Sequence, residues 1–299
     1  MEKQEFDSYI KAGKIATKVK ANARKKVKVG MTLLELAEGI EKEIIEEGGK
    51  PAFPVNLSAN NIAAHYTPKI NDESEIQEND VLKIDIGVQV EGFIADCACT
   101  VDFSGNNEKL LEASEKALQN ALSIVKPGLK IGKIGEEIEK TIKGFGFNPV
   151  YNLSGHGLAK YETHAFPTIP NHANKDSKVL ENEMAFAIEP FATDGQGHVM
   201  EGNDVEIFSM TAPQNCRSQT ARKILALVEK EYKTLPFAER WIQKELKLSE
   251  FERKIALKEL LQRGILHQYP ILHEQKGKLV SQAETSIIIN NDEVKILVD

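Results

Sequence analysis

Two aspartates in the segment from Val81 to Val101 are spaced in a way that could bind a cation. The segment reads VLKIDIGVQVEGFIADCACTV, and its alternation of apolar and polar residues predicts a β-hairpin centred on Val90-Glu91. In that register one face is wholly apolar, and on the other face Asp85 lies directly opposite Asp96. Opposed carboxylates with Cβ atoms about 4.5 to 5.5 Å apart repel unless one is protonated or a cation lies between them. We favour a shared cation; the alternative is that both acids face solvent in a slightly different register.

Three further residues could complete a cation site. Glu189, in MAFAIEPF, lies in an apolar strand pattern, where an unpaired carboxylate would be costly. Glu284, in SQAETSIII, enters another β-branched strand in the same manner. His156, in NLSGHGLAK, stands between two glycines, which let the backbone bring an imidazole close to a crowded site. Together with the two aspartates, these residues supply four carboxylates and one imidazole.

This donor set predicts a centre with two divalent cations. Four carboxylates contribute a charge of −4, which two divalent ions balance, and neighbouring metals can share bridging carboxylates and one hydroxide. Oxygen-rich ligation with a single imidazole suits Mn, Fe or Co better than a tetrahedral structural zinc site, but occupancy follows availability. We therefore expect two divalent ions drawn from Co, Mn, Fe or Zn.

Two histidines flank these predicted ligands at related points of the chain. His65 lies in NNIAAHYTP and His164 in YETHAFPTIP. Neither is needed to balance the metal charge, so each is free to donate a hydrogen bond to a substrate. A lone histidine is more often a satisfied surface or core residue, whereas the paired placement of these two favours a functional interpretation.

The elements that position these residues come as two related halves. Segments 28–51 and 126–149 match at nine of 24 positions at a constant offset of 98, and each predicts a helix between glycines. The sequence NLS at Asn56 recurs at Asn152, and END before one strand is echoed by ENE before another. The alternative is chance similarity between two helices rich in Glu, Lys and Ile. The shared order favours duplication, and we expect two halves related by an approximate two-fold axis.

The remaining pattern is typical of the α+β fold class. Helices are predicted over 3–26 and 107–125, and strands over 81–88, 93–103, 184–190 and 284–290. If the strands of Glu189 and Glu284 form a second hairpin, residues 213–280 are an insertion at its tip. That stretch predicts helices over 220–233, 237–245 and 250–261 and then a short extended stretch, which suits a winged-helix-like subdomain. We expect a catalytic domain of residues 1–212 and 281–299 and an inserted helical subdomain of residues 213–280.

Charge is unevenly distributed along the chain. The 299 residues include 38 Lys+Arg and 45 Asp+Glu, and this net charge of −7 argues against global nucleic-acid binding. Residues 213–280, however, hold 14 Lys+Arg and 8 Glu, a net charge of +6. A solvated surface is the usual meaning, and a contact with ribosomal RNA is the alternative hypothesis. The basic run from Lys18 to Lys28 allows the same two interpretations.

The sequence indicates a cytoplasmic protein without membrane contact. No stretch approaches the ~18 uncharged apolar residues of a membrane span, and the N-terminus lacks the apolar block of a signal peptide. Cys97, Cys99 and Cys216 are too few for a disulfide framework and fit a reducing compartment. The hairpin pattern assigns the first two cysteines to the core.

The motifs taken together resemble a known family. DVLKIDIGVQVEGFIAD, SGHG, THAFP, AIEPF and QAETS occur in the order found in methionine aminopeptidases of the pita-bread fold. The insertion between Glu189 and Glu284 resembles the type 2 branch. The lack of a long charged or zinc-binding extension before the catalytic part resembles its short archaeal form. Glu91 at the hairpin tip departs from the family pattern, which more often has a smaller polar residue there.

The resemblance implies a set of roles for the residues. The implied ligands of two metal ions are Asp85, Asp96, His156, Glu189 and Glu284, with Asp96 and Glu284 bridging. His65 would contact the scissile amide or the N-terminal region of the substrate, and His164 would contact the carbonyl oxygen. Phe53 and Tyr269 would help to line the pocket for the methionine side chain, a flexible thioether that suits an aromatic slot.

The activity that the resemblance implies is co-translational removal of the N-terminal methionine from nascent proteins whose second residue is small. Metals would lower the pKa of a bridging water, and the resulting hydroxide would attack the peptide carbonyl. Glu189 would pass the proton to the leaving amine. The resemblance also implies a monomer.

Two other functions remain open within the same fold. Xaa-Pro aminopeptidases or prolidases have a large N-terminal domain and different histidine spacing, whereas only 84 residues precede Asp85 here. A non-catalytic RNA- or protein-binding homologue would have lost metal ligands, and all five are present. A carboxylate-bridged helical bundle is excluded, because its ligands would lie on helices with Glu-x-x-His spacing.

Overall fold

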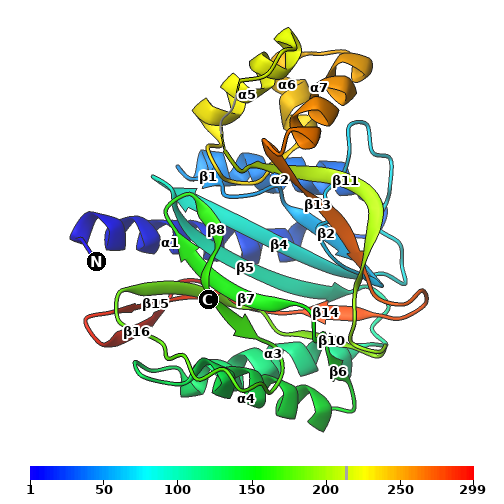
Figure 1. Cartoon of the computed structure of the whole chain (residues 1–299). Helices are drawn as coiled ribbons and strands as arrows, with labels where there is room; N and C mark the ends of the chain where they lie inside the picture. Colours follow the sequence, from blue (N-terminus) through cyan, green and yellow to red (C-terminus); the bar gives the residue numbers. More distant parts are fainter. Residues whose placement is uncertain (213–214) are drawn as a thin grey trace.

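The largest sheet joins the two halves of the chain. The computed structural model describes residues 1–212 and 215–299. The strands of this sheet are β1 (Lys50–Pro51), β2 (Asn56–Ala59), β4 (Val81–Val90), β5 (Phe93–Asp102), β7 (Ser154–Ala159), β8 (Glu162–Pro170), β9 (Met184–Ile188), β15 (Glu284–Asn290) and β16 (Glu293–Ile296). They run in the order β1-β4-β5-β15-β9-β7-β8, with β2 paired to β4 and β16 to β15 (Figure 1). Because β15 pairs antiparallel with both β5 and β9, it connects the first half to the second.

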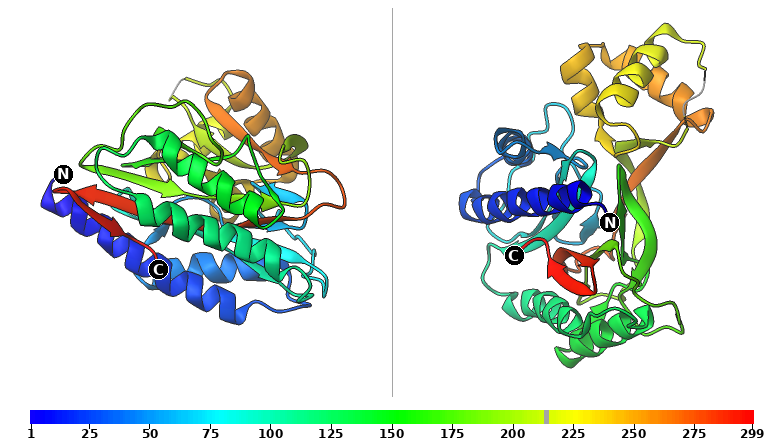
Figure 2. Two further views of the ribbon diagram at one scale, coloured as in Figure 1. Left: turned by 90° about the horizontal axis from the view of Figure 1, so that it is seen from below. Right: turned by 90° about the vertical axis from the view of Figure 1, so that its left-hand side faces the viewer.

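Two pairs of helices cover the sheet (Figure 2). α1 (Lys3–Lys26) and α2 (Leu33–Glu46) pack on the first half, and α3 (Glu108–Ile124) and α4 (Ile131–Gly144) pack on the second. α2 begins at a capping box, in which Thr32 accepts from the backbone of Glu35 and the Glu35 side chain accepts from Thr32. Its buried apolar residues recur at the three- and four-residue spacing of an amphipathic helix.

The correspondence between the two halves, predicted from the repeat, is confirmed in the elements. α2 and α4 have bounds that differ by the same offset of 98. Gly30 and Gly128 before these helices have φ of 79° and 77°, and Gly48 and Gly146 after them have φ of 84° and 88°. Glycine adopts such positive φ values without a steric penalty, which explains why it occupies both ends of both helices.

The hairpin of β4 and β5 forms as predicted, but the predicted register is wrong by two residues. Asp85 pairs with Ala98 rather than with Asp96. The turn is Glu91-Gly92, with φ of 53° and 92°, and not Val90-Glu91. A two-residue hairpin turn of this kind needs positive φ at both central residues, which glycine adopts readily and β-branched valine does not. A shift of two keeps every side chain on its face, so both aspartates still share the polar face.

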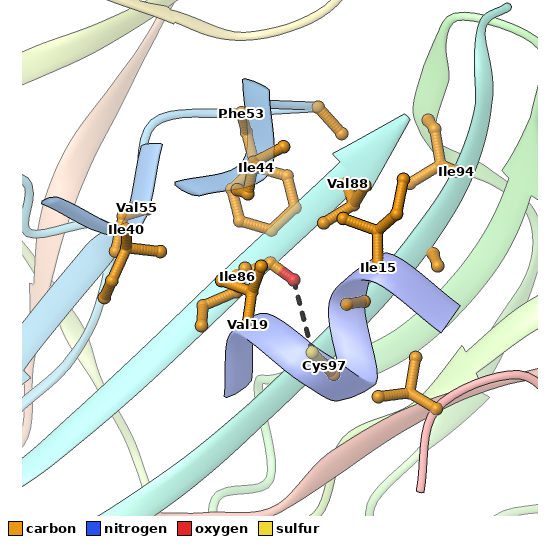
Figure 3. Packing of buried hydrophobic residues seen from close by; sticks show 14 of the residues in the cluster. Ile15, Val19, Ile40, Ile44, Phe53, Val55, Ile86, Val88, Ile94 and Cys97 are labelled. Atoms are coloured by element: carbon orange, nitrogen blue, oxygen red, sulfur yellow. Dashed lines mark hydrogen bonds between the residues drawn. The ribbon is translucent and has the colours of Figure 1, made fainter. Parts of the chain in front are cut away.

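The apolar face of this hairpin lies in the core, as predicted. Cys97 and Cys99 are both buried, and the Cys97 thiol donates to the backbone oxygen of Ile86 at 3.5 Å. Ile15 and Val19 of α1 pack over the same strands (Figure 3). The core on this side therefore holds β4 and β5 rigidly, while their other face is left for the site.

A second, smaller sheet carries three helices in residues 219–262, called the helical stretch below. Its strands are β3 (Ile62–Ala64), β11 (Met200–Met210), β12 (Phe237–Ala238) and β13 (Leu266–His273), in the order β12-β11-β13-β3. α5 (Gln219–Glu231), α6 (Glu239–Leu246) and α7 (Glu250–Gln262) lie at its end and share a hydrophobic cluster (Figure 1). These helices were predicted within two residues of their bounds. Pro213, where the expected insertion starts, lies outside the described residues.

A third sheet has three strands, all from the second half of the chain. β10 (Phe191–Thr193) pairs with both β6 (Asn148–Pro149) and β14 (Val280–Gln282), which directly precedes β15. The strands of Glu189 and Glu284 pair antiparallel, as expected for a second hairpin. Across residues 1–212 and 215–299, no helix combines the length and the apolar composition that a membrane crossing requires.

Candidate metal centre and substrate pocket

Four neighbouring strands place the predicted acidic ligands on one face of the large sheet. In β2, β4, β5 and β15, Asn56 lies opposite Asp85, Asp85 opposite Ala98, and Ala98 opposite Glu284. Directly opposed residues of antiparallel strands point to the same side, so this row directs two carboxylates toward one space. Asp96 lies on the same face, two residues along β5. The small Ala98 between the acids leaves room above the sheet.

The remaining ligands reach this space from the second half. Glu189 directly follows β9, and His156 lies on β7, which pairs with β9. The His156 Nε2 atom is 3.6 Å from Glu189 Oε1 and 3.8 Å from Asp96 Oδ2. One donor atom from each of Asp96, His156 and Glu284 lies within 4.8 Å of the others. The structure thus brings together the residues that the sequence predicted as ligands.

The glycines beside His156 let the backbone pass close to its neighbours, as predicted from the sequence. A Cβ atom on Gly155 would lie 2.3 Å from the Ala187 backbone oxygen, and one on Gly157 would lie 2.1 Å from the Phe166 backbone oxygen. Both distances are far below van der Waals contact, so only glycine lets β7 pass this close to β8 and β9. The close approach carries the imidazole of His156 into the acidic space.

Burial keeps the acids of this site from ionising on their own. Desolvation raises the pKa of Asp85 to about 7. It also raises the pKa of Asp96, Glu189 and Glu284 well above the usual range, and the neighbouring carboxylates raise these further. Burial lowers the pKa of His156 to about 3, with a smaller contribution from His164. In the protein without a cation, each group therefore favours its neutral form.

The donor set fits a divalent cation. Among the described residues, Asp85 Oδ1 and Asp96 Oδ1 are buried without any hydrogen-bond partner. A buried carboxylate oxygen without a partner is costly, and a cation is the group that satisfies several of them at once. Hard carboxylate oxygens with one imidazole nitrogen are ordinary ligands for divalent transition metals.

A cavity of about 310 Å³ opens directly over these ligands. All nine residues predicted for the site line it, namely Phe53, His65, Asp85, Asp96, His156, His164, Glu189, Tyr269 and Glu284. Its volume lies near the lower end of the range of ~300–1,000 Å³ typical of small-molecule pockets. The cavity is therefore large enough for one side chain and the reacting groups next to it.

The two flanking histidines both lie next to the ring of Tyr269. The ring centroid of Tyr269 is 5.5 Å from that of His65 and 6.1 Å from that of His164, and the Tyr269 hydroxyl is 3.1 Å from Ser209 Oγ. His164 is also 4.6 Å from His156, between their ring centroids. Burial lowers the pKa of both flanking histidines, that of His65 to about 4. Both are therefore neutral at pH 7, with one N–H each. In His65 that proton lies on Nδ1, which donates to the Pro270 carbonyl oxygen and leaves Nε2 as an acceptor toward the cavity.

His65 is held in an uncommon backbone conformation. Its φ is 65°, and its Nδ1 atom is 3.1 Å from the backbone oxygen of Pro270 on β13. A non-glycine residue at positive φ costs free energy and is enriched at functional sites. The pairing of β3 with β13 maintains this conformation and directs the imidazole into the cavity.

Several residues of the pocket wall were not predicted. Asn56, Ala64, Asn152, Leu153, Ser154, Thr163, Ala165, Thr168, Phe191, Ile207 and Pro236 also line the cavity. The repeated NLS motif marked Asn56 and Asn152, and its recurrence in both halves was the signal that could have identified them. Ile207 and Pro236 lie beside the other wall residues only in the folded chain, and no pattern in the sequence marks them.

Comparison with known proteins assigns this architecture to a family. The family model described as metallopeptidase family M24 matches residues 7–209. This chain belongs to metallopeptidase family M24. The methionine aminopeptidase of Pyrococcus horikoshii is 46% identical over 293 residues, which cover 98% of this chain and 99% of that protein.

Solved structures show the same fold. The structure of a thermophilic Arx1 has a TM-score of 0.86 at 20% identity and covers 100% of this chain and 91% of that chain. The methionine aminopeptidase of Rickettsia prowazekii has a TM-score of 0.72 at 18% identity, with coverage of 100% and 98%. These two similarities concern the fold alone. They confirm the pita-bread architecture predicted from the motifs, and M24 membership implies a divalent metal for the acidic site.

Proposed function

We propose that this M24 protein removes the N-terminal methionine from nascent proteins whose second residue is small. The observation that carries the proposal is the nearly full-length similarity to a protein named methionine aminopeptidase. The site supports it, since the predicted metal ligands and pocket residues converge on one cavity. Neither Xaa-Pro cleavage nor non-catalytic binding has comparable support.

We propose that two divalent ions, drawn from Co, Mn, Fe or Zn, occupy the acidic site. The proposed ligands are Asp85, Asp96, His156, Glu189 and Glu284, with Asp96 and Glu284 shared by both ions. The mutual proximity of Asp96, His156 and Glu284 and the unpartnered carboxylate oxygens support this assignment. Bound divalent ions would lower the pKa of a coordinated water and polarise the scissile carbonyl.

In this proposal the side chains of the chain position the substrate and move its protons. Phe53 and Tyr269 hold the methionine side chain, and the neutral His65 orients the scissile amide. His164 donates its N–H to the carbonyl oxygen, where negative charge develops during attack. Glu189, whose carboxylate lies 3.6 Å from the His156 Nε2 atom, passes a proton to the leaving amine.

Binding of the free α-amine next to the metal ligands limits cleavage to the first residue. The proposed metal ligands line the same cavity as Phe53 and Tyr269, so the α-amine would lie beside the ions. A free amine has a lone pair to offer there, and an acetylated amine does not. A small second residue is expected because the cavity of about 310 Å³ must hold the methionine side chain together with the α-amine and the scissile amide.

Release of methionine from a Met-Ala-Ser peptide tests the proposal. The protein is stripped of metal with a chelator, reloaded with Co²⁺ or Mn²⁺, and assayed beside Met-Lys, Xaa-Pro and acetylated Met-Ala-Ser peptides. Metal-dependent cleavage of Met-Ala-Ser alone is expected. Cleavage of the Xaa-Pro peptide instead would indicate the prolidase-like alternative. No cleavage with any divalent metal would favour the non-catalytic binding protein.

The cellular setting is also part of the proposal. A substrate that emerges from the ribosome places the protein in the cytoplasm, and we propose that it acts there as a monomer. The inserted subdomain of residues 213–280, with its net charge of +6, is the proposed surface for a transient contact with the ribosome. An electrophoretic shift with ribosomal RNA that disappears at moderate salt is expected, and no shift at low salt would refute this contact.

A further inference from the structure

A buried arginine of the helical stretch reaches into the body of the protein. Arg240 is the second residue of α6, and its side chain is only 5% exposed. Its Nη2 atom donates to the carboxylate of Glu41 on α2, and its Nη1 atom donates to Thr67 Oγ1 at 3.1 Å. The neighbouring Trp241 donates its indole N–H to the other oxygen of Glu41 at 2.9 Å. The residues that these bonds join lie 173 to 200 positions apart in the sequence.

The same two groups, the Glu41 carboxylate and the Thr67 hydroxyl, hold the backbone of Val55, which lies between two residues of the pocket wall. The Glu41 carboxylate accepts from the Val55 N–H at 3.3 Å, and the Thr67 hydroxyl donates to the Val55 carbonyl at 2.8 Å. Val55 is fully buried and lies in the irregular segment between β1 and β2. Arg240 therefore contacts both groups that fix the two polar backbone atoms of Val55.

The position of Val55 links this network to substrate binding. Phe53 and Asn56, on either side of it, both line the cavity, and Asn56 faces Asp85 in the sheet. Pro236, four residues before Arg240, lines the cavity from the helical stretch itself. The position of the Phe53–Asn56 side of the cavity and that of the Pro236 side therefore both depend on the packing of α6 against α2.

We propose that Arg240 is a positioning residue for the substrate pocket. It anchors α6 against α2 and so fixes the position of the pocket-wall segment from Phe53 to Asn56. Arginine suits this task because its planar guanidinium donates to two acceptors in fixed directions. Removing it leaves the Glu41 carboxylate buried without its cation, and Val55 then loses a fixed partner. The effect on substrate binding rests on the aminopeptidase activity proposed above, whereas the seating of α6 does not.

The test compares Arg240→Met with the unmodified, metal-loaded full chain in two assays. Trp241 is the only tryptophan in the chain, so its emission reports the α6–α2 contact without any turnover. We expect a red-shifted emission in Arg240→Met. We also expect the KM for Met-Ala-Ser to rise about tenfold with kcat nearly unchanged, because the pocket wall moves while the reacting groups do not.

Arg253→Met is the matched control. Arg253 is equally buried, but it bonds Glu239, Gln243 and Leu248 within the helical stretch. This variant should lose stability and keep the KM of the unmodified protein. An equal rise of KM in Arg253→Met would overturn the proposal, since the effect would then be general loosening of the helical stretch.

A milder variant keeps the proposal testable if Arg240→Met does not fold. Thr67→Val removes one link to Val55 at nearly constant volume and should raise KM about threefold, the equivalent of one ordinary hydrogen bond. An unchanged KM in Thr67→Val, or a red-shifted Arg240→Met with unchanged KM, would refute the role in the pocket. If the unmodified protein releases no methionine, the proposed function fails instead, and the emission shift still tests the seating of α6.

Discussion

Replacing Gly87 by alanine should narrow or distort the proposed methionine slot. Gly87 lies on β4 against the ring of Phe53, and Phe53 belongs to the same hydrophobic cluster as Ile44 and Val88 (Figure 3). A Cβ atom on Gly87 would lie 2.2 Å from Phe53 Cε1, whereas ordinary contact begins at 3.4 Å. The ring must therefore move by about 1.2 Å, the difference between these distances. A core at native packing density does not absorb that movement, so the ring shifts on its cavity side.

The displacement is large enough to measure in two ways. Overpacking of this kind costs about 1–3 kcal/mol of the free energy of unfolding. A wall misplaced by about 1 Å should lower kcat/KM for Met-Ala-Ser by about 10- to 100-fold. The control is Gly87→Ala combined with Phe53→Leu, which removes the clash and should recover most of the lost stability. If Gly87→Ala loses stability but keeps kcat/KM within twofold, the Phe53 ring is not a wall of the slot and the reasoning is wrong.

Two further predictions concern the reacting groups and the acids. His164→Ala should lower kcat by about one to three orders of magnitude with the metal still bound, because one donor to the developing negative charge is lost. The measurement is turnover, with the metal content of the same sample determined in parallel. Unchanged turnover would remove His164 from the mechanism. The metal-free protein should lose stability as pH rises from about 6.5 to 8, measured by urea unfolding. In that window the acids of the unfolded chain are ionised. The folded protein still binds protons on Asp85, whose pKa is about 7, and on the other site carboxylates, whose pKa values are raised further. Because the folded state binds more protons than the unfolded state, the free energy of unfolding falls as pH rises. Lys83, whose pKa burial lowers to about 7, opposes this with a single proton. The site histidines are neutral in the folded protein and oppose it only near pH 6.5, where the unfolded imidazoles are about half protonated. Glu284→Gln should make the pH dependence shallower. Added divalent metal should also reduce it, leaving the part due to buried acids outside the site, such as Glu206 with a pKa of about 7. A stability that rises with pH would contradict the assignment of the buried acids.

The sequence predicted best what local patterns control. The two amphipathic helices were found as a repeat at an offset of 98, and α2 and α4 have bounds with that offset. Glycines with positive φ end both helices, and such signals act within a few residues of the chain. Alternation likewise separated the core face of the hairpin, with Cys97 and Cys99, from the polar face with its two aspartates.

Alternation could not determine which residues on that face are neighbours. A period of two is unchanged by a shift of two residues, so the register depended on the turn alone. Placing the turn at Val90-Glu91 made Asp85 oppose Asp96, whereas the folded turn at Glu91-Gly92 makes Asp85 oppose Ala98. The five predicted ligands nevertheless converge because the sheet order β4-β5-β15-β9-β7 places their strands side by side.

The sequence by itself thus determined the chemistry available to this protein, namely four carboxylates, three histidines and two aromatic residues on strand-like segments, in an order typical of a metallopeptidase. Only the tertiary structure decided the walls of the pocket. Val55, Thr67 and Arg240 come together from segments with no shared periodicity, and a hydrogen bond between Glu41 and Arg240 spans 199 residues. Side-chain contacts at such separations follow from how helices and sheets pack in three dimensions, and they leave no local pattern from which they could be predicted.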